Sequence, residues 1–85
     1  MRANEELKQT KTVVVGLGKT GFACARFLSR MGVPVAVTDS RVDPPMLDRV
    51  HEELPDLPMF LGGFDQHALN QAELIVISPG VALNE

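Results

Sequence analysis

The chain of 85 residues has neither tryptophan nor tyrosine, and its one cysteine is Cys24. Without tryptophan and tyrosine it lacks the platform on which single-stranded bases usually stack. A lone cysteine has no disulfide partner within the chain, and no apolar run reaches the roughly 18 residues that cross a membrane. We therefore expect a protein of the reducing cytoplasm, in which Cys24 is a small core residue rather than a nucleophile.

Positive charge is also sparse. The 8 lysines and arginines are outnumbered by 11 aspartates and glutamates, the net formal charge is −3, and the basic residues form no stripe. Extended nucleic-acid binding is therefore excluded, and any phosphate binding must be local. A hydrophobic fraction of 45% with 22% charged residues is typical of a globular domain, so we expect neither a membrane nor a nucleic acid as partner.

A glycine-rich turn follows the first apolar run. Residues 12–15, Thr-Val-Val-Val, are typical of a strand buried on both faces of a parallel sheet, and GLGKTG follows at residues 16–21. Such a turn lets the backbone approach a diphosphate, and the next helix directs its free N–H groups and positive dipole end at the anion. We predict that Gly16 and Gly18 face a ligand and that Gly21 packs a helix against a strand.

The same segment is not a P-loop. That motif requires a glycine five residues before Gly18, where Val13 stands, so ATP hydrolysis by this turn is excluded. Thr20 remains able to donate its hydroxyl or N–H group to a phosphate, and Lys19 adds positive charge.

Apolar spacing and turn residues divide the chain into alternating strands and helices. The further strands are predicted at residues 35–38, 59–61 and 74–77. The helices are predicted at residues 19–31, at 44–54 with Asp43 as N-cap, and at 65–71 with Asp65 as N-cap. Right-handed crossovers then give an α/β, Rossmann-like parallel sheet in the order 3-2-1-4 with helices on both faces.

Two of these helices have a recognisable apolar face. The face of the first is predicted to consist of Cys24, Phe27, Leu28 and Met31. The face of the second is predicted to consist of Leu47, Val50 and Leu54.

Ligands of such sheets bind beyond the carboxyl ends of the strands, so the loops there should form one crevice. Asp39 would accept hydrogen bonds from ribose hydroxyls in a dinucleotide enzyme, whereas Arg41 favours a phosphate or lies flat against a base. The alternative is that Asp39 only caps its own turn. After the fourth strand, Gly80, close to Ser78, is able to offer its N–H group to a diphosphate or sugar, although a plain tight turn explains this segment almost as well.

The sequence offers no catalytic set and no metal site. His51 and His67 lie on polar segments, far apart and without a second ligand at metal spacing. No paired carboxylates and no Ser/His/Asp arrangement are present. We therefore predict a nucleotide-binding module without a catalytic residue.

The domain is predicted to occupy residues 12–85 after a polar lead-in at residues 1–11. Doubly wound domains normally continue beyond a fourth strand, so we expect a truncated single domain from a larger multidomain protein. Residues 74–77 would then form an exposed apolar edge that promotes association.

Four segments together carry a family resemblance. They are VVGLGKTG at 14–21, TDSR at 38–41 with two following prolines, GGF at 62–64 and ISPGV at 77–81. In this combination the chain resembles, over nearly its whole length, the N-terminal domain of the MurD-type Mur ligases. The resemblance implies a Rossmann-like domain that holds the UDP part of UDP-N-acetylmuramoyl-L-alanine.

The resemblance also implies the binding residues: Gly18, Lys19, Thr20, Asp39, Ser40, Arg41 and Gly80, supported by Gly16, Gly21 and Ser78. Lys19 and Thr20 would contact the diphosphate, Lys19 through its backbone N–H because the family often has an apolar residue there. Residues 39–41 would form the uracil pocket, where Ser40 keeps the hydroxyl of a common threonine. Gly80 would approach the phosphate or the sugar.

For the full-length protein the resemblance implies ATP-dependent ligation in the bacterial cytoplasm, within peptidoglycan synthesis. The alanine carboxylate is phosphorylated to an acyl phosphate, which D-glutamate attacks. The sites for ATP and Mg²⁺ would lie in a central domain, and D-glutamate would meet a C-terminal domain; both domains are missing here. The fragment would therefore bind no cofactor and be inactive alone.

The residues themselves leave two other interpretations open. One is the NAD(P)-binding domain of an oxidoreductase, in which Asp39 would face the ribose. The other is a regulatory nucleotide-sensing module attached to a channel or transporter. Selectivity for uridine over nicotinamide dinucleotides separates the ligase domain from the oxidoreductase.

Overall fold

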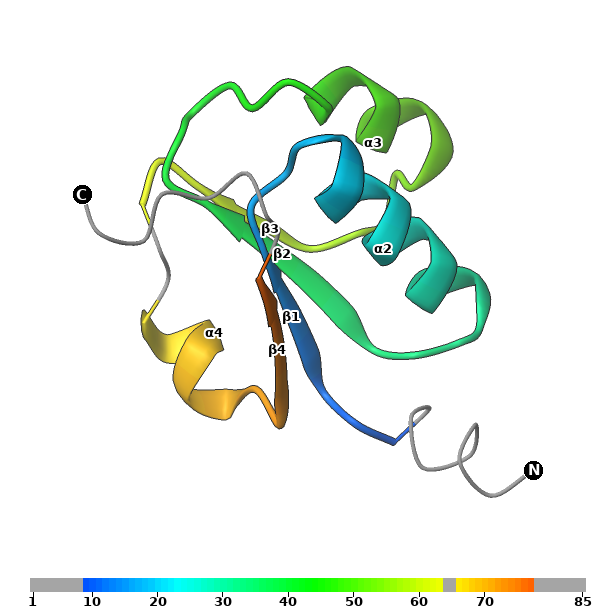
Figure 1. Cartoon of the computed structure of the whole chain (residues 1–85), viewed down its shortest axis with the longest axis vertical. Helices are drawn as coiled ribbons and strands as arrows, with labels where there is room; N and C mark the ends of the chain where they lie inside the picture. Colours follow the sequence, from blue (N-terminus) through cyan, green and yellow to red (C-terminus); the bar gives the residue numbers. More distant parts are fainter. Residues whose placement is uncertain (1–8, 64–65, 78–85) are drawn as a thin grey trace.

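The computed structural model describes residues 9–63 and 66–77. The strands are β1 (Thr12–Val15), β2 (Val35–Asp39), β3 (Met59–Leu61) and β4 (Leu74–Ile77). The helices are α2 (Lys19–Arg30), α3 (Leu47–Glu53) and α4 (Gln66–Gln71). All strand pairs are parallel, and the sheet order is β3-β2-β1-β4. Helices α2 and α3 cover one face of the sheet and α4 the other (Figure 1), which confirms the predicted architecture.

The core lies between the sheet and helices α2 and α3. Val14 of β1 pairs in register with Val37 of β2, and both are fully buried. Both valines belong to one hydrophobic cluster with Leu28 of α2 and Val50 of α3, so this pair lies beneath these helices. Burial of such side chains is the main source of stability in a domain this small.

Helix α2 buries a different stripe from the one predicted. Its buried residues are Gly21, Phe22, Ala25 and Leu28. Phe27 is 63% exposed, so its predicted place in the core was wrong. Successive side chains of an α-helix are rotated by about 100° around its axis. Leu28 therefore points into the core while Phe27 points to solvent. Small residues in the stripe, which give a weak apolar signal, account for the error, while Cys24 and Met31 pack against the margin of the core.

Helix α3 begins later than predicted. Its N-cap is Met46, with no side-chain capping bond, so Asp43 is not the cap. A proline disfavours helical backbone in the residue before it, and Asp43 and Pro44 each precede a proline. The chain instead makes a turn in which the Leu47 N–H donates to the Pro44 carbonyl at 3.1 Å. The predicted cap of α4, Asp65, lies outside the described residues.

Helices α2 and α3 are joined on the surface through Glu53. Its carboxylate accepts from Arg26 Nη1 at 3.3 Å and from Arg49 Nε at 2.7 Å. The guanidinium carbons of Arg26 and Arg49 also lie 5.2 and 5.3 Å from the centre of the Phe22 ring. These contacts hold α2 against α3.

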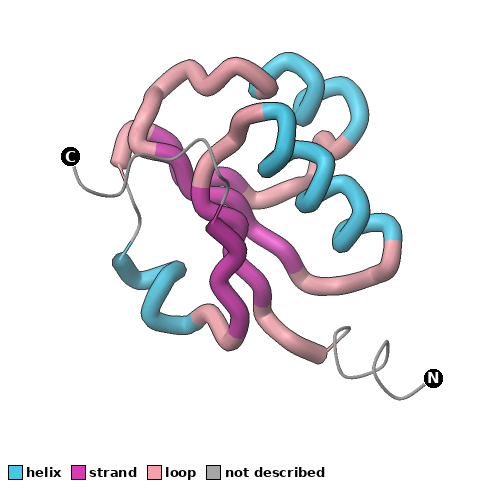
Figure 2. The backbone as a smooth tube through the Cα atoms, in the orientation of Figure 1, coloured by secondary structure: helices cyan, strands magenta, loops and turns pink. Residues whose placement is uncertain are grey.

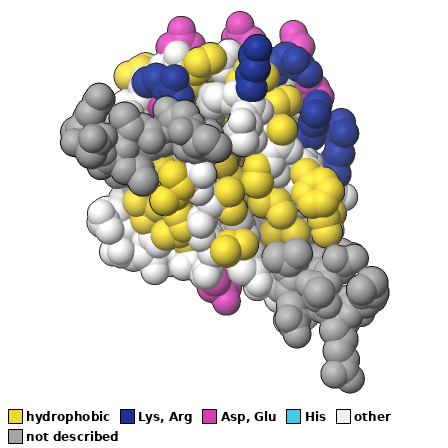
Figure 3. All heavy atoms as spheres, in the orientation of Figure 1, with side chains coloured by type: hydrophobic (Ala, Val, Ile, Leu, Met, Phe, Trp, Pro, Cys, Tyr) yellow, Lys and Arg dark blue, Asp and Glu magenta, His cyan; other side chains and the backbone are white. Residues whose placement is uncertain are grey.

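Within the described sheet, β4 is an edge strand that pairs only with β1. Its apolar side chains are unusually open, with exposed fractions of 39% for Leu74, 45% for Ile75 and 49% for Ile77. Figure 3 shows hydrophobic side chains gathered at the centre of this view, around β4. An apolar edge of this kind is a template for pairing with another chain.

We expect the chain to self-associate as its concentration rises, and Ile75→Lys to reduce this, because a charge on an edge strand opposes strand pairing. Sedimentation velocity over a concentration series measures the effect. The matched control is Val42→Lys, which adds the same charge at a residue that is 76% exposed and outside the sheet. A sharp wild-type monomer at high concentration, or equal association of both variants, contradicts the prediction.

Candidate functional site

The carboxyl ends of β1 and β2 bring two loops together. The register pairs Val15 with Thr38, so the glycine turn lies beside the tip of β2. Gly16 has φ of 98°, a backbone conformation that favours glycine, and its N–H donates to the Thr38 carbonyl at 2.8 Å. Figure 2 shows the connections that follow β1, β2 and β3 at the same end of the sheet.

The N-terminus of α2 opens onto this edge. Gly18 is its N-cap, and the first helical hydrogen bond runs from the Phe22 N–H to the Gly18 carbonyl at 2.9 Å. No side chain of the described residues caps this end. Lys19 and Thr20 are exposed. Because the first N–H groups of a helix have no partner within the helix, this end, with the positive end of the helix dipole, suits an anion.

Gly18 leaves room for such an anion. Its backbone is extended, with φ of −93° and ψ of −167°, which any residue adopts. A Cβ atom added to it would meet no atom of another described residue within 4 Å, its chain neighbours apart. The missing side chain of Gly18 therefore leaves open space in front of the turn, whereas Gly21 is buried in α2.

Asp39 connects the two loops. Its side chain is almost fully buried, with 3% of its surface exposed. Atom Oδ2 accepts from the Leu17 N–H at 2.7 Å and from Arg41 Nη2 at 2.7 Å. Atom Oδ1 accepts from the Arg41 N–H at 2.8 Å and from Arg41 Nε at 2.9 Å. Asp39 thus caps its own turn, as the alternative interpretation proposed, and also holds the glycine turn.

These contacts determine the ionisation of Asp39. Burial by itself would raise its pKa, but hydrogen bonds from the Arg41 guanidinium, the Leu17 N–H and the Arg41 N–H outweigh burial and lower the pKa to about 2. The same ion pair raises the pKa of Arg41. The carboxylate is therefore charged at neutral pH, and so is its partner.

A third loop braces the tip of β2. The Gly62 N–H donates to the Asp39 and Arg41 carbonyls, both at 3.1 Å, and Gly63 forms an isolated bridge with Asp39. Both glycines have positive φ, 84° and 155°. The sequence did not predict that this segment contacts the tip of β2, although a glycine pair after a strand is a signal for such a turn. It also did not predict the hydrogen bond from Leu17 to Asp39.

The described structure therefore gathers most of the predicted site at one edge: Gly16, Gly18, Lys19, Thr20, Asp39, Ser40 and Arg41. Ser40 is exposed, and the side chain of Arg41 is half exposed. The predicted residues Ser78 and Gly80 lie outside the described residues.

The described residues contain no cluster of three or more histidine, cysteine, aspartate or glutamate side chains that could hold a metal ion. His51 on α3 and His67 on α4 are both exposed. In this part of the chain, no helix has the length and apolar character needed to span a bilayer.

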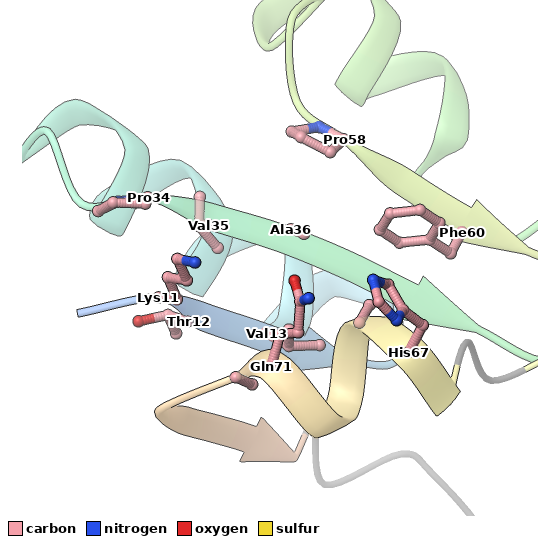
Figure 4. A pocket seen from close by; sticks show the side chains of 12 residues that line it. Lys11, Thr12, Val13, Pro34, Val35, Ala36, Pro58, Phe60, His67 and Gln71 are labelled. Atoms are coloured by element: carbon pink, nitrogen blue, oxygen red, sulfur yellow. The ribbon is translucent and has the colours of Figure 1, made fainter. Parts of the chain in front are cut away.

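A cavity of about 370 Å³ lies elsewhere, between α4 and the sheet. Figure 4 shows Val13 and Ala36 on its floor and His67 and Gln71 on its α4 side. Its other walls include Lys11, Pro34 and Pro58, which precede strands. The cavity is therefore near the amino ends of the strands and is not the nucleotide crevice expected at the carboxyl ends.

The chain is similar to known proteins. Residues 10–85 match the family described as Mur ligase MurD-like, N-terminal domain. The UDP-N-acetylmuramoylalanine--D-glutamate ligase of Nitrosococcus oceani is 51% identical over 74 residues, which are 87% of this chain and 16% of that protein. The ligase of the same name from Marinobacter nauticus is 45% identical over 75 residues, 88% of this chain and 17% of that protein. The chain thus spans about a sixth of these curated relatives.

The lowered pKa of Asp39 predicts a pH-dependent contribution to stability. The pKa of this carboxyl is 3.8 in the unfolded chain and about 2 in the folded one, so its stabilising effect is complete above about pH 5 and is lost as the pH falls toward 2. The shift corresponds to roughly 2 kcal/mol in the free energy of unfolding at neutral pH.

Asp39→Asn removes this titration. Urea unfolding should show that the stability difference between wild type and variant is smaller at pH 3 than at pH 7 by about 1 kcal/mol. The matched control is Asp56→Asn, which makes the same substitution at an exposed residue outside the helices and strands, and the pH dependence of Asp39→Asn is compared with it. An equal difference at both pH values for Asp39→Asn would contradict the lowered pKa.

Proposed function

Because the chain belongs to the MurD-like N-terminal domain family of the Mur ligases, we propose that it binds the UDP part of UDP-N-acetylmuramoyl-L-alanine. The observation that carries the proposal is the N-terminus of α2, which no side chain of the described residues caps, and which follows Leu17, a residue that shares the Asp39 carboxylate with Arg41. The relatives are named for UDP-N-acetylmuramoylalanine, a nucleotide-sugar with a diphosphate and a uracil base. The two parts of the edge suit these two chemical groups.

The diphosphate lies, in this proposal, in front of the glycine turn. The N–H groups of Gly18, Lys19 and Thr20 and the helix dipole bind its oxygens, and the exposed Thr20 hydroxyl adds a donor. Lys19 acts through its backbone N–H rather than its ammonium group. This arrangement binds phosphate by backbone groups, which suits a chain with few basic residues.

The uracil ring lies at the tip of β2. The Arg41 guanidinium is held by two hydrogen bonds to Asp39, and its half-exposed plane offers a surface on which a base stacks. Ser40 is exposed beside it and offers a hydroxyl as donor or acceptor to the polar edge of uracil. Gly80 and Ser78 would close the site near the phosphate or sugar.

In the full-length protein this domain holds the substrate while other domains perform ATP-dependent ligation of D-glutamate in the bacterial cytoplasm. ATP with Mg²⁺ supplies the phosphoryl group that activates the alanine carboxylate, from sites outside this chain. The residues described here contribute binding and orientation, and this chain alone is inactive in the proposal.

An amide NMR titration of the chain with UDP tests the function. NAD and its phosphorylated form are titrated into separate samples for comparison. We expect saturable shifts at residues 18–20 and 39–41 with UDP alone. Shifts with a nicotinamide dinucleotide and none with UDP would contradict the proposal and favour an oxidoreductase domain.

Gly18→Ala should weaken the affinity for UDP at least about tenfold, because its methyl group occupies the space proposed for the diphosphate. The variant should keep its stability, since the extended backbone of Gly18 suits any residue and the added Cβ contacts none of the described residues beyond its chain neighbours.

Lys19→Ala is the matched comparison. Its affinity for UDP should fall by no more than about threefold, because the backbone N–H group remains and water and salt screen the charge of an exposed ammonium group. Isothermal calorimetry with UDP measures both variants. Equal losses in the two variants, or unchanged binding by Gly18→Ala, contradict the proposed phosphate position.

A further inference from the structure

We propose that Asp39 is a positioning residue, whose carboxylate holds the glycine turn in the shape that binds a diphosphate and accepts no hydrogen bond from the nucleoside. The inference deepens the proposed function and rests on it. It differs from the role that an acidic residue at this position has in dinucleotide enzymes, where the carboxylate binds the ribose hydroxyls directly.

The first argument is that the carboxylate is already saturated. An ionised carboxylate has about four lone-pair sites. Four N–H groups occupy those of Asp39: one from Leu17 and three from Arg41, at 2.7 to 2.9 Å. Only 3% of the side chain is exposed. A ribose hydroxyl or a uracil N–H would therefore have to displace a charge-assisted bond to reach it.

The second argument is the position of Leu17. It stands between Gly16 and Gly18, two residues with little side-chain restraint of their own. Its side chain is fully buried in the core, and its N–H is drawn to Asp39 at 2.7 Å. The hydrogen bond fixes the peptide between Gly16 and Leu17, and the buried side chain fixes Leu17 itself, from which the chain continues into Gly18 and α2. Because Leu17 stands directly before the N-cap Gly18, anchoring Leu17 constrains the direction of the first N–H groups of α2 in this proposal.

The third argument is that one carboxylate serves both parts of the crevice. The atom that binds the Leu17 N–H, Oδ2, also binds Arg41 Nη2. The phosphate side and the proposed base side of the edge therefore share an anchor. Loss of Asp39 should disturb both sides together, whereas loss of a simple nucleoside acceptor would disturb only one.

Charge gives the test a clear sign. Asp39 is negative and lies in the same crevice as the proposed diphosphate, so its removal should strengthen anion binding if charge alone mattered. A positioning role predicts the opposite, because an unfixed glycine turn no longer presents converging N–H groups. Inorganic pyrophosphate, which lacks the nucleoside, separates these two effects.

The experiment measures binding of pyrophosphate and of UDP to this chain by NMR titration, in wild type, Asp39→Ala and Asp39→Asn. We expect Asp39→Ala to weaken both probes by a similar factor of about ten, the size of a lost hydrogen bond to a charged group. Asp39→Asn should weaken pyrophosphate binding less than Asp39→Ala does, because the side-chain amide oxygen is still able to accept a hydrogen bond from the Leu17 N–H.

Asp43→Asn is the control variant. It removes the same charge from an exposed residue of the loop that follows β2, and it should change pyrophosphate binding by no more than about twofold. If Asp39→Ala fails to fold, the test is the ratio of the affinities of Asp39→Asn for pyrophosphate and for UDP, compared with the same ratio in the wild type. Weaker UDP binding with unchanged or tighter pyrophosphate binding, in either Asp39 variant, overturns the proposal.

The amide signal of Leu17 is the readout that needs no ligand. A short hydrogen bond to a carboxylate places this proton downfield, and it should move upfield in both Asp39 variants. An unmoved Leu17 signal overturns the proposal, whatever the binding data show. If the wild type binds neither probe, the proposed function fails, while the anchoring of Leu17 is still decided by this signal.

Discussion

The hydrogen bonds that meet at the Asp39 carboxylate are the constraint on which the candidate site depends. They join the turn after β1 to the tip of β2 through Leu17 and Arg41, and they compensate the cost of burying a charge. Because the ion pair and the backbone bonds share the same two oxygens, neither loop is positioned independently of the other. The geometry of a phosphate-binding turn here is therefore set by a side chain from the neighbouring strand.

The sheet makes this contact possible. Parallel pairing of β1 with β2 places Val15 opposite Thr38, so the next residues of both strands leave the sheet side by side. The buried pair of Val14 and Val37 fixes that register, since a slip by one residue would turn valines away from the core. Packing in the core thus determines which loops share the edge, and the loops determine which chemical groups the edge is able to bind.

The elements that follow strong periodic signals were predictable from the sequence: four short strands, their order, and a helix after the glycine turn. Features that depend on the third dimension were not. The outward position of Phe27 follows from a buried stripe rich in small residues, and the late start of α3 follows from consecutive prolines. The bond between Asp39 and Leu17 joins residues 22 positions apart, and no local pattern encodes it. The glycine turn and the acidic strand end were each visible in the sequence; their connection was not.

The central claim is that UDP binds at the carboxyl edge, with its diphosphate before the glycine turn. The most direct measurement is a crystal structure of this chain with UDP. The account predicts phosphate oxygens within hydrogen-bond distance of the N–H groups of residues 18–20, the uracil ring beside Arg41, and an unchanged bond from Leu17 to Asp39. UDP in the cavity between α4 and the sheet, or a ribose hydroxyl bound to Asp39 in place of Arg41, would contradict it.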